Sequence, residues 1–135
     1  MTIISFNFRK IDAERGENAK GQVKISNNIS IKDIQSIDLK LGQNKDKALR
    51  FSFTFDTKYE PKFGHIKFEG NLVYMGTPEN IKKIEKEWKK GKKLAKEVAQ
   101  EVMSHVVEKG NIEAIILSRT VGLPSPVPLP KVKTK

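Results

Sequence analysis

The chain contains no cysteine, and this absence removes several kinds of chemistry at once. Its 135 residues form no disulfide, offer no thiolate nucleophile and hold no metal through sulfur. Histidine is nearly as scarce, because His65 and His105 are the only two, and neither belongs to a serine-histidine-acid pattern or a metal-ligand spacing. We therefore expect a protein that is not an enzyme and that uses no metal or other cofactor.

Long hydrophobic runs are also lacking. The mean hydropathy of -0.51 is too low for a membrane span. The first ten residues do not show a basic segment followed by a long apolar run, so we expect no signal peptide and a cytoplasmic location. The apolar fraction of 37% still allows a modest core. We expect a single domain over residues 1–130, followed by a basic, disordered tail at 131–135.

Acidic residues are outnumbered. Lysine and arginine total 26 against 16 aspartates and glutamates, which gives a net charge of +10 and favours anionic partners such as nucleic acid, an anionic membrane surface or acidic polypeptides. Only four of the basic residues are arginines, and the planar guanidinium is the group that reads base edges best. Sequence-specific DNA recognition is therefore not expected.

The first half of the chain alternates between apolar and polar residues, which is typical of strands that bury one face. Polar segments rich in turn-forming residues separate the alternating runs. The simplest arrangement is a four-stranded antiparallel meander. Its strands are predicted in residues 4–8, 23–41, 49–55 and 66–74.

The phase of the alternation makes two finer predictions. Ile4, Phe6 and Phe8 fall on one face of the first run. In the second run the apolar residues occupy odd positions, except for Ile34. We therefore expect a bulge or bend within residues 32–36 that changes the phase of this strand.

The pattern becomes helical after Thr77. The triplet Thr77-Pro78-Glu79 combines an N-cap, a proline at the first helical position and an acidic residue in the first turn. An apolar stripe with helical spacing continues from there and predicts one helix over residues 78–109. Gly91 lies within the stripe and leaves open the alternative of two helices.

The last part of the chain predicts a further short helix and an extended tail. Lys109-Gly110 is expected to end the preceding helix, and residues 112–121 to form a short helix closed by Gly122. The alternating prolines of residues 124–130 then favour an extended strip, exposed or docked. The predicted architecture is thus α+β, a sheet packed with one long helix or two, a short C-terminal helix and a proline-rich tail.

Lysines cover the face of the predicted helix opposite its apolar stripe. This face is either simply solvated or a surface that binds anions without sequence specificity. The residues expected to bind anions under the second interpretation are Lys82, Lys86, Lys89, Lys90 and Lys93.

The order of these elements, with the closing segment IILSRTVGLPSPVPLP of residues 115–130, resembles the SecB family of export chaperones. That segment is similar to a helix ending in Ser-Arg followed by an extended run rich in proline and leucine, a feature we associate with archaeal SecB-like proteins. The resemblance implies a four-stranded antiparallel sheet backed by helices, assembly into homodimers or homotetramers, and grooves that hold unfolded polypeptides without ATP.

The resemblance also suggests which residues bind polypeptide. The net charge departs from the acidic character of the bacterial family members. We therefore consider two functions: an ATP-independent chaperone that binds unfolded or extended polypeptides, and a lysine-rich protein that binds nucleic acid nonspecifically. Under the first, the residues expected to line the groove are Phe51, Phe53, Phe55, Tyr74, Leu123 and Pro124.

Overall fold

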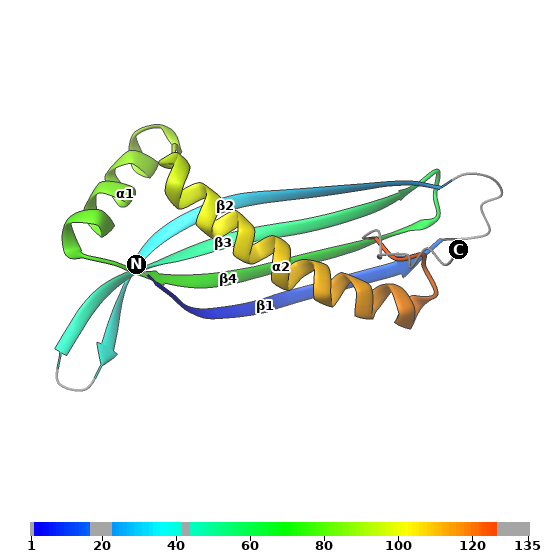
Figure 1. The fold of residues 1–135 in the computed structure, drawn as a ribbon, viewed down its shortest axis with the longest axis horizontal. Coiled ribbons are helices and arrows are strands. Elements are labelled where there is room, and N and C mark those ends of the chain that lie inside the picture. The colour runs from blue at the N-terminus through cyan, green and yellow to red at the C-terminus, as the bar shows by residue number, and fades with distance from the viewer. Residues whose placement is uncertain (1, 17–22, 42–43, 127–135) are drawn as a thin grey trace, which may run out of the picture.

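Four strands and two helices make up the computed structural model, which describes residues 2–16, 23–41 and 44–126. In chain order these elements are β1 (Thr2–Arg15), β2 (Lys24–Leu41), β3 (Asn44–Glu60), β4 (Gly64–Met75), α1 (Pro78–Gly91) and α2 (Lys96–Val121). Figure 1 shows α2 crossing the four strands on one side of the sheet, with α1 at the end of the molecule where β4 ends. The predicted α+β architecture, an antiparallel sheet packed with helices, is confirmed.

The strand order is β1-β4-β3-β2, and all three pairings are antiparallel. Strands β2, β3 and β4 form a meander, and β1 pairs with the outer side of β4. One row of the sheet runs from Phe8 through Gly70 and Phe53 to Ile31. Because β1 and β2 are the edges of the sheet, each leaves one row of backbone groups unpaired within it.

The predicted change of phase in β2 is confirmed. The register between β2 and β3 shifts between Ile31 and Asp33, so that Lys32 is the extra residue of a β-bulge. As a result Ile34 lies opposite Phe51 and is only 6% exposed. The out-of-phase isoleucine therefore marks the bulge that brings it into the core.

A second bulge in β1 corrects the predicted face of Ile4. The register between β1 and β4 shifts between Ile3 and Ser5, so that Ile3 lies opposite Tyr74 and packs against the core. Ile4 is the extra residue and is 45% exposed. Period-two alternation alone predicts the wrong face for Ile4, because a bulge reverses the facing of the residues on one side of it.

The segment that was predicted to form either one long helix or two helices forms two. The Oγ1 atom of Thr77 accepts a hydrogen bond from the backbone N–H of Asn80 at 3.4 Å, which confirms the predicted N-cap. Helix α1 ends at Gly91, and Lys92 adopts a left-handed conformation with φ of 52°. The chain then re-enters helix at Lys96, so the single helix over 78–109 is wrong and the two-helix alternative is confirmed.

The predicted helix end at Lys109-Gly110 is also wrong. Gly110 lies within α2, and residues 112–121 are the last turns of this helix rather than a separate one. Small side chains recur every four residues along the buried side of α2, and Gly110 belongs to this series. The series is Val98, Val102, Val106, Gly110, Ala114 and Ser118. Gly122, with φ of 77°, ends the helix as predicted.

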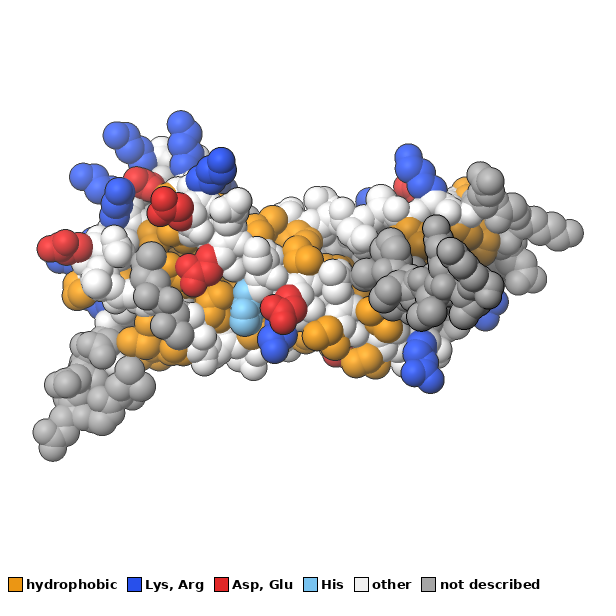
Figure 2. Space-filling model, viewed as in Figure 1, with side chains coloured by type: hydrophobic (Ala, Val, Ile, Leu, Met, Phe, Trp, Pro, Cys, Tyr) orange, Lys and Arg blue, Asp and Glu red, His pale blue; other side chains and the backbone are white. Residues whose placement is uncertain are grey.

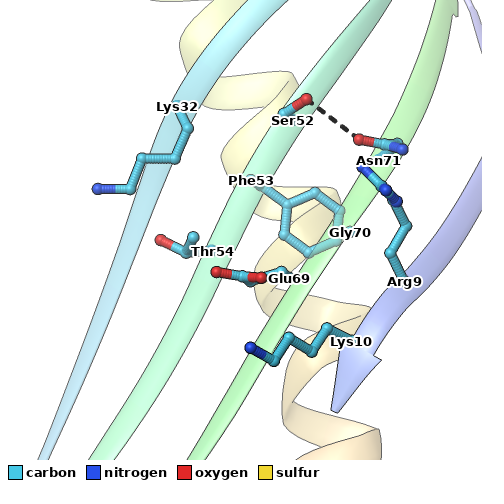
Figure 3. Close-up of a pocket in the computed structure, with 9 residues that line it drawn as sticks. All are labelled: Arg9, Lys10, Lys32, Ser52, Phe53, Thr54, Glu69, Gly70 and Asn71. Atoms are coloured by element: carbon cyan, nitrogen blue, oxygen red, sulfur yellow. Dashed lines mark hydrogen bonds between the residues drawn. The ribbon is translucent and has the colours of Figure 1, made fainter.

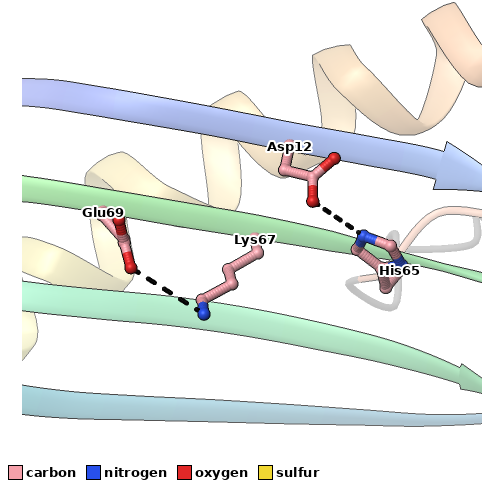
Figure 4. A network of polar contacts seen from close by, with 4 residues as sticks. All are labelled: Asp12, His65, Lys67 and Glu69. Carbon is pink, nitrogen blue, oxygen red and sulfur yellow. Dashed lines mark hydrogen bonds and ion pairs between the residues drawn. The ribbon is translucent and has the colours of Figure 1, made fainter.

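The sheet face opposite the helices carries polar side chains. Ser52 donates a hydrogen bond to Asn71 at 3.1 Å, and the Arg50 guanidinium donates one to the side chain of Gln35 at 2.6 Å. Figure 4 shows two more contacts on the same face, between His65 and Asp12 at 3.1 Å and between Lys67 and Glu69 at 3.8 Å. We call this surface the open face, because neither helix covers it.

Several predictions fall on residues that the structure does not describe. They are residues 17–22 of the polar segment between the first two predicted strands, the proline-rich strip beyond Pro126 and the basic tail at 131–135. Between residues 2 and 126, in the parts that are described, no helix has both the length and the apolarity needed to cross a membrane.

Candidate polypeptide-binding surface

An aromatic layer covers the helix-facing side of the sheet. Phe51, Phe53 and Phe55 alternate along β3, and Tyr74 lies on the neighbouring β4. The rings of Phe51 and Tyr74 meet edge to face with centroids 5.9 Å apart. The four strand residues predicted to line a groove are therefore brought together on one face, as their alternation indicates.

Three further phenylalanines extend this layer toward β1. Phe6 stacks on Phe53 with ring centroids 5.0 Å apart, and Phe8 lies 5.0 Å from Phe68. Phe6 and Phe8 are half-buried, so the layer reaches the surface beside the β1 edge. The alternation of Phe6 and Phe8 placed them on a buried face, but only the pairing of β1 with β4 puts them beside Phe53.

The helices leave almost none of the predicted groove residues accessible. Phe51, Phe53, Phe55 and Tyr74 are each at most 1% exposed, and they belong to the same core cluster as Ile81, Val102 and Val106 of the helices. A polypeptide can reach these four rings only where α2 or its neighbours move away from the sheet. Their assignment to a binding surface stays a prediction.

The two buried tyrosines present their hydroxyls to different partners. The Tyr74 hydroxyl lies 3.4 Å from Oε2 of Glu101 on α2 and donates a hydrogen bond to it. Burial, followed by the charge of Glu101 and this hydrogen bond, raises the pKa of Tyr74 to about 12. Burial alone raises the pKa of Tyr59 to about 12. Both phenols therefore stay protonated at neutral pH and serve as donors.

Residues 122–126, here called the strap, lie against the sheet beyond the end of α2. The Tyr59 hydroxyl donates a hydrogen bond to the carbonyl oxygen of Pro124 at 2.7 Å. The Asn27 amide donates a longer one, of 3.4 Å, to the carbonyl of Pro126. Leu123 is only 7% exposed and joins the core, whereas Pro124 is exposed. Of the six predicted groove residues, Pro124 alone is exposed to solvent.

Exposed apolar side chains gather on two elements. Among the residues that the structure describes, the large ones are Ile4 and Ile11 of β1, and Val107, Ile112 and Ile116 of α2. Figure 1 shows that the C-terminal half of α2 lies on the β1 side of the sheet. Figure 2 shows hydrophobic side chains at this margin of the molecule. The edge strand β1 and the outer side of α2 thus combine unpaired backbone with exposed apolar surface, and no local pattern predicted that these two elements lie together.

The predicted lysine face is found on α1 and on the segment that follows it. Lys82, Lys86, Lys89, Lys90 and Lys93 are all exposed, and Figure 2 shows basic side chains grouped at the α1 end of the molecule. Four of them, with Glu85, border a shallow hollow of about 530 Å³. The ammonium of Lys89 lies 3.0 Å from the Glu85 carboxylate. The structure thus brings these lysines together at one end of the molecule.

Comparison with known proteins identifies the fold. No protein-family model matches the chain, and no curated protein matches its sequence. Among solved structures, it is similar to the SecB-like chaperone Rv1957 of Mycobacterium tuberculosis, which was solved in complex with a ChAD peptide from the Rv1956 HigA1 antitoxin. The TM-score is 0.58 at 10% sequence identity, and the match covers 99% of this chain and 91% of the other.

This similarity extends over nearly the full length of both chains. It includes the four-stranded antiparallel sheet and the two helices, so the chain has a SecB-like α+β fold. At 10% identity the likeness concerns the fold.

Proposed function

We propose that this protein is a SecB-like chaperone that works in the cytoplasm and holds unfolded or extended polypeptides without using ATP. One observation carries the proposal: the fold matches that of a peptide-binding SecB-like chaperone over 99% of the chain. The closing segment of residues 115–130, which resembles the family in sequence, supports the same assignment. The activity is one of binding, so no catalytic residue is assigned.

The aromatic layer and the strap are the proposed binding region. Unfolded clients expose apolar side chains, and burying these against aromatic rings is favourable by about 25 cal/mol per Å². The half-buried rings of Phe6 and Phe8 offer a first contact at the margin of the layer. Phe51, Phe53, Phe55 and Tyr74 then become available as the covering elements shift, and Leu123 and Pro124 border the far end.

Suppression of aggregation tests this activity directly. A chemically denatured client protein is diluted into buffer with and without the chaperone, and light scattering is followed in the absence of ATP. We expect scattering to fall as the chaperone approaches an equimolar amount, and added ATP to change nothing. Scattering that is unaffected by a several-fold excess of the protein would contradict the proposal.

Matched variants then locate the site. Phe8→Ala removes a ring at the margin of the layer, whereas Thr54→Ala removes a small polar side chain from the open face. We expect the first to weaken suppression and the second to leave it unchanged. Thermal melts of both variants separate a loss of binding from a loss of stability, since a half-buried phenylalanine also contributes to the fold.

Nonspecific binding of nucleic acid is the alternative, and the exposed lysines around α1 are the observation that favours it. Fluorescence polarisation with duplex DNA over a series of salt concentrations tests it. Phosphate binding releases counterions and weakens steeply with salt, whereas apolar capture of a client is tolerant of salt. Tight, steeply salt-dependent DNA binding that Lys86→Gln with Lys90→Gln abolishes, together with no suppression of aggregation, would favour the alternative.

Assembly into a homodimer or homotetramer is part of the proposal. The unpaired edge of β1 and the exposed Ile11, Ile112 and Ile116 are features that self-association covers in many proteins. Multi-angle light scattering should give at least twice the chain mass of 15.3 kDa. Ile112→Lys should shift the distribution toward monomer, whereas Lys83→Glu on α1 should leave it unchanged. A wild-type protein that is monomeric at all micromolar concentrations would contradict this part.

A further inference from the structure

A hollow of about 470 Å³ lies on the open face of the sheet, on the side away from the helices. Its walls include Arg9 and Lys10 of β1, Lys32 of β2, Thr54 of β3, and Glu69 and Asn71 of β4. All four strands therefore contribute to it (Figure 3). The proposed client-binding region lies on the helix side of the sheet, and only Phe53, whose ring points to that side, also borders this hollow. The inference therefore goes beyond polypeptide binding.

Two β-bulges shape the hollow. Arg9 is the extra residue between Phe8 and Lys10, and Lys32 is the extra residue between Ile31 and Asp33. Phe8 and Ile31 are the two ends of one row of the sheet, the row that also contains Gly70 and Phe53. The bulges thus lie beside the same row, on the two opposite edges of the sheet. Bulges of this kind redirect side chains and are frequent near functional sites.

The row between the bulges forms the floor of the hollow. Phe53 and Phe8 direct their rings to the helix side, and a Cβ atom on Gly70 would point the same way, toward the Phe53 ring. The floor of the hollow is therefore backbone, and polar side chains of the two adjacent rows surround it. A Cβ atom added to Gly70 would clash with the carbonyl oxygen of Asn7 and crowd the Phe53 ring, so glycine is required at this point of the sheet.

The charges around the hollow are not balanced. Arg9, Lys10 and Lys32 contribute three positive charges and Glu69 one negative charge, a sum of +2. Among the residues that the structure describes, no carboxylate lies within 4.0 Å of these three cations, and Glu69 is instead 3.8 Å from Lys67. Figure 3 shows the side chains of Arg9 and Lys10 extending over β4.

Neutral donors complete the surroundings. The Asn71 side-chain oxygen already accepts a hydrogen bond from Ser52 at 3.1 Å, so its amide nitrogen is the group left to donate. The hydroxyl of Thr54 is a further donor at the wall of the hollow. A guanidinium fork, two ammonium groups and neutral N–H and O–H donors are a set that matches a group with several anionic oxygens.

We propose that this hollow binds a small molecule that carries a phosphate group. A phosphate monoester has a charge of about -1.5 to -2 at pH 7, which matches the sum of +2 around the hollow. Its three terminal oxygens accept several hydrogen bonds at once, whereas a carboxylate has two oxygens and one charge. Glu69, at the wall, is placed to accept a hydrogen bond from a hydroxyl of the rest of the ligand.

Titration with inorganic phosphate and pyrophosphate tests the proposal. The full chain is used at low salt in a phosphate-free buffer, and binding is followed by calorimetry and by ¹H–¹⁵N spectra. We expect pyrophosphate to bind and to shift the backbone resonances of Gly70 and Asn71 together with the side-chain amide of Asn71. Arg9→Gln, and separately Lys32→Gln, should weaken binding by about tenfold or more, the effect of losing a hydrogen bond to a charged group.

Lys58→Gln is the matched control. Lys58 is an exposed lysine of β3 on the same face, but it does not border the hollow, so its replacement removes the same charge elsewhere. We expect this variant to bind within about twofold of the wild type. The proposal is overturned if Lys58→Gln weakens binding as much as Arg9→Gln, because the effect would then be the overall charge.

Three other outcomes would also overturn it. They are no binding of either anion at millimolar concentration, equal binding of acetate, and displacement of pyrophosphate by duplex DNA or by vesicles of anionic lipid at far lower concentration. The first two exclude a phosphate site, and the third assigns the face to a macromolecular partner. Aggregation assays on Arg9→Gln keep the two proposals separate, since this variant should suppress aggregation as the wild type does.

Discussion

Gly110 of α2 lies directly over the ring of Phe55 in β3. A Cβ atom added to Gly110 would be 2.6 Å from Cδ2 of that ring, and Phe55 is only 1% exposed. The helix can approach the aromatic layer this closely only because residue 110 has no side chain.

This contact predicts opposite effects at two helical glycines. Alanine normally stabilises a helix by up to about 1 kcal/mol relative to glycine. At Gly110 the clash with a buried ring outweighs this gain, so Gly110→Ala should lower the free energy of unfolding by about 1–2 kcal/mol. At Gly91 the nearest atoms belong to the flexible side chain of Lys93, at 3.8 Å, so Gly91→Ala should be neutral or stabilising by about 0.5 kcal/mol. Urea unfolding measures both, and equal effects would show that Gly110 does not fix the approach of α2.

The bulge in β2 predicts which single deletion the sheet tolerates. Removing Lys32 joins Ile31 to Asp33 in a regular ladder, and Ile34 still lies opposite Phe51. We expect this deletion to cost no more than about 1 kcal/mol. If Ser30 is deleted instead, Lys32 takes a regular position in the ladder and the register beyond it is kept. Ile31 then points to the open face and Lys32 toward the core.

The Ser30 deletion should therefore cost several kcal/mol, because it exposes an isoleucine and places a lysine against apolar side chains. Thermal melting of the two deletion variants is the measurement. If both melt at the same temperature, Lys32 is not the extra residue of the strand.

The strap predicts a contrast between two adjacent residues. The proline-rich pattern left open whether this segment is exposed or docked, and the burial of Leu123 shows that its start is docked. Leu123→Ala should lower stability by about 2–4 kcal/mol, as for other buried leucines. Pro124→Ala should stay within about 0.5 kcal/mol, because its side chain is exposed and the carbonyl that accepts from Tyr59 remains. Similar losses in the two variants would argue against docking through Leu123.

The buried phenol of Tyr74 predicts loss of stability at alkaline pH. Its pKa is about 12 in the folded protein and about 10 in the unfolded chain. Between these values the unfolded chain releases the proton and the folded protein keeps it, which favours unfolding. The contribution of this group is therefore complete below pH 10 and is lost as the pH rises toward 12.

Tyr74→Phe separates this effect from the titration of the lysines. The variant should be less stable than the wild type at pH 8.5 by about 1 kcal/mol, the value of a hydrogen bond. The difference should shrink or change sign at pH 11, because phenylalanine has no proton to release. Urea unfolding at both values is the measurement, and a difference that is independent of pH would contradict the raised pKa.

Much of the local structure could be predicted from the sequence, because local structure depends on neighbours in the chain. Alternation located the strands, and Ile34 marked the bulge of β2 through its phase. Thr77-Pro78 set the start of α1, and Gly122 the end of α2, because backbone groups at helix ends need caps. The aromatic face of β3 followed from period two in the same way.

Features that depend on residues distant in the chain are visible only in the folded structure. Gly110 has the sequence signature of a helix end, and only the ring of Phe55 beneath it explains why the helix continues and packs there. The placement of β1 beside β4 joins Phe6 to Phe53, a contact that no local pattern specifies. Arg9 and Lys32 belong to strands at opposite edges of the sheet, and they face one hollow because two bulges fall beside one row. Such relationships arise from strand pairing and packing, which a one-dimensional pattern constrains only through the face of each side chain.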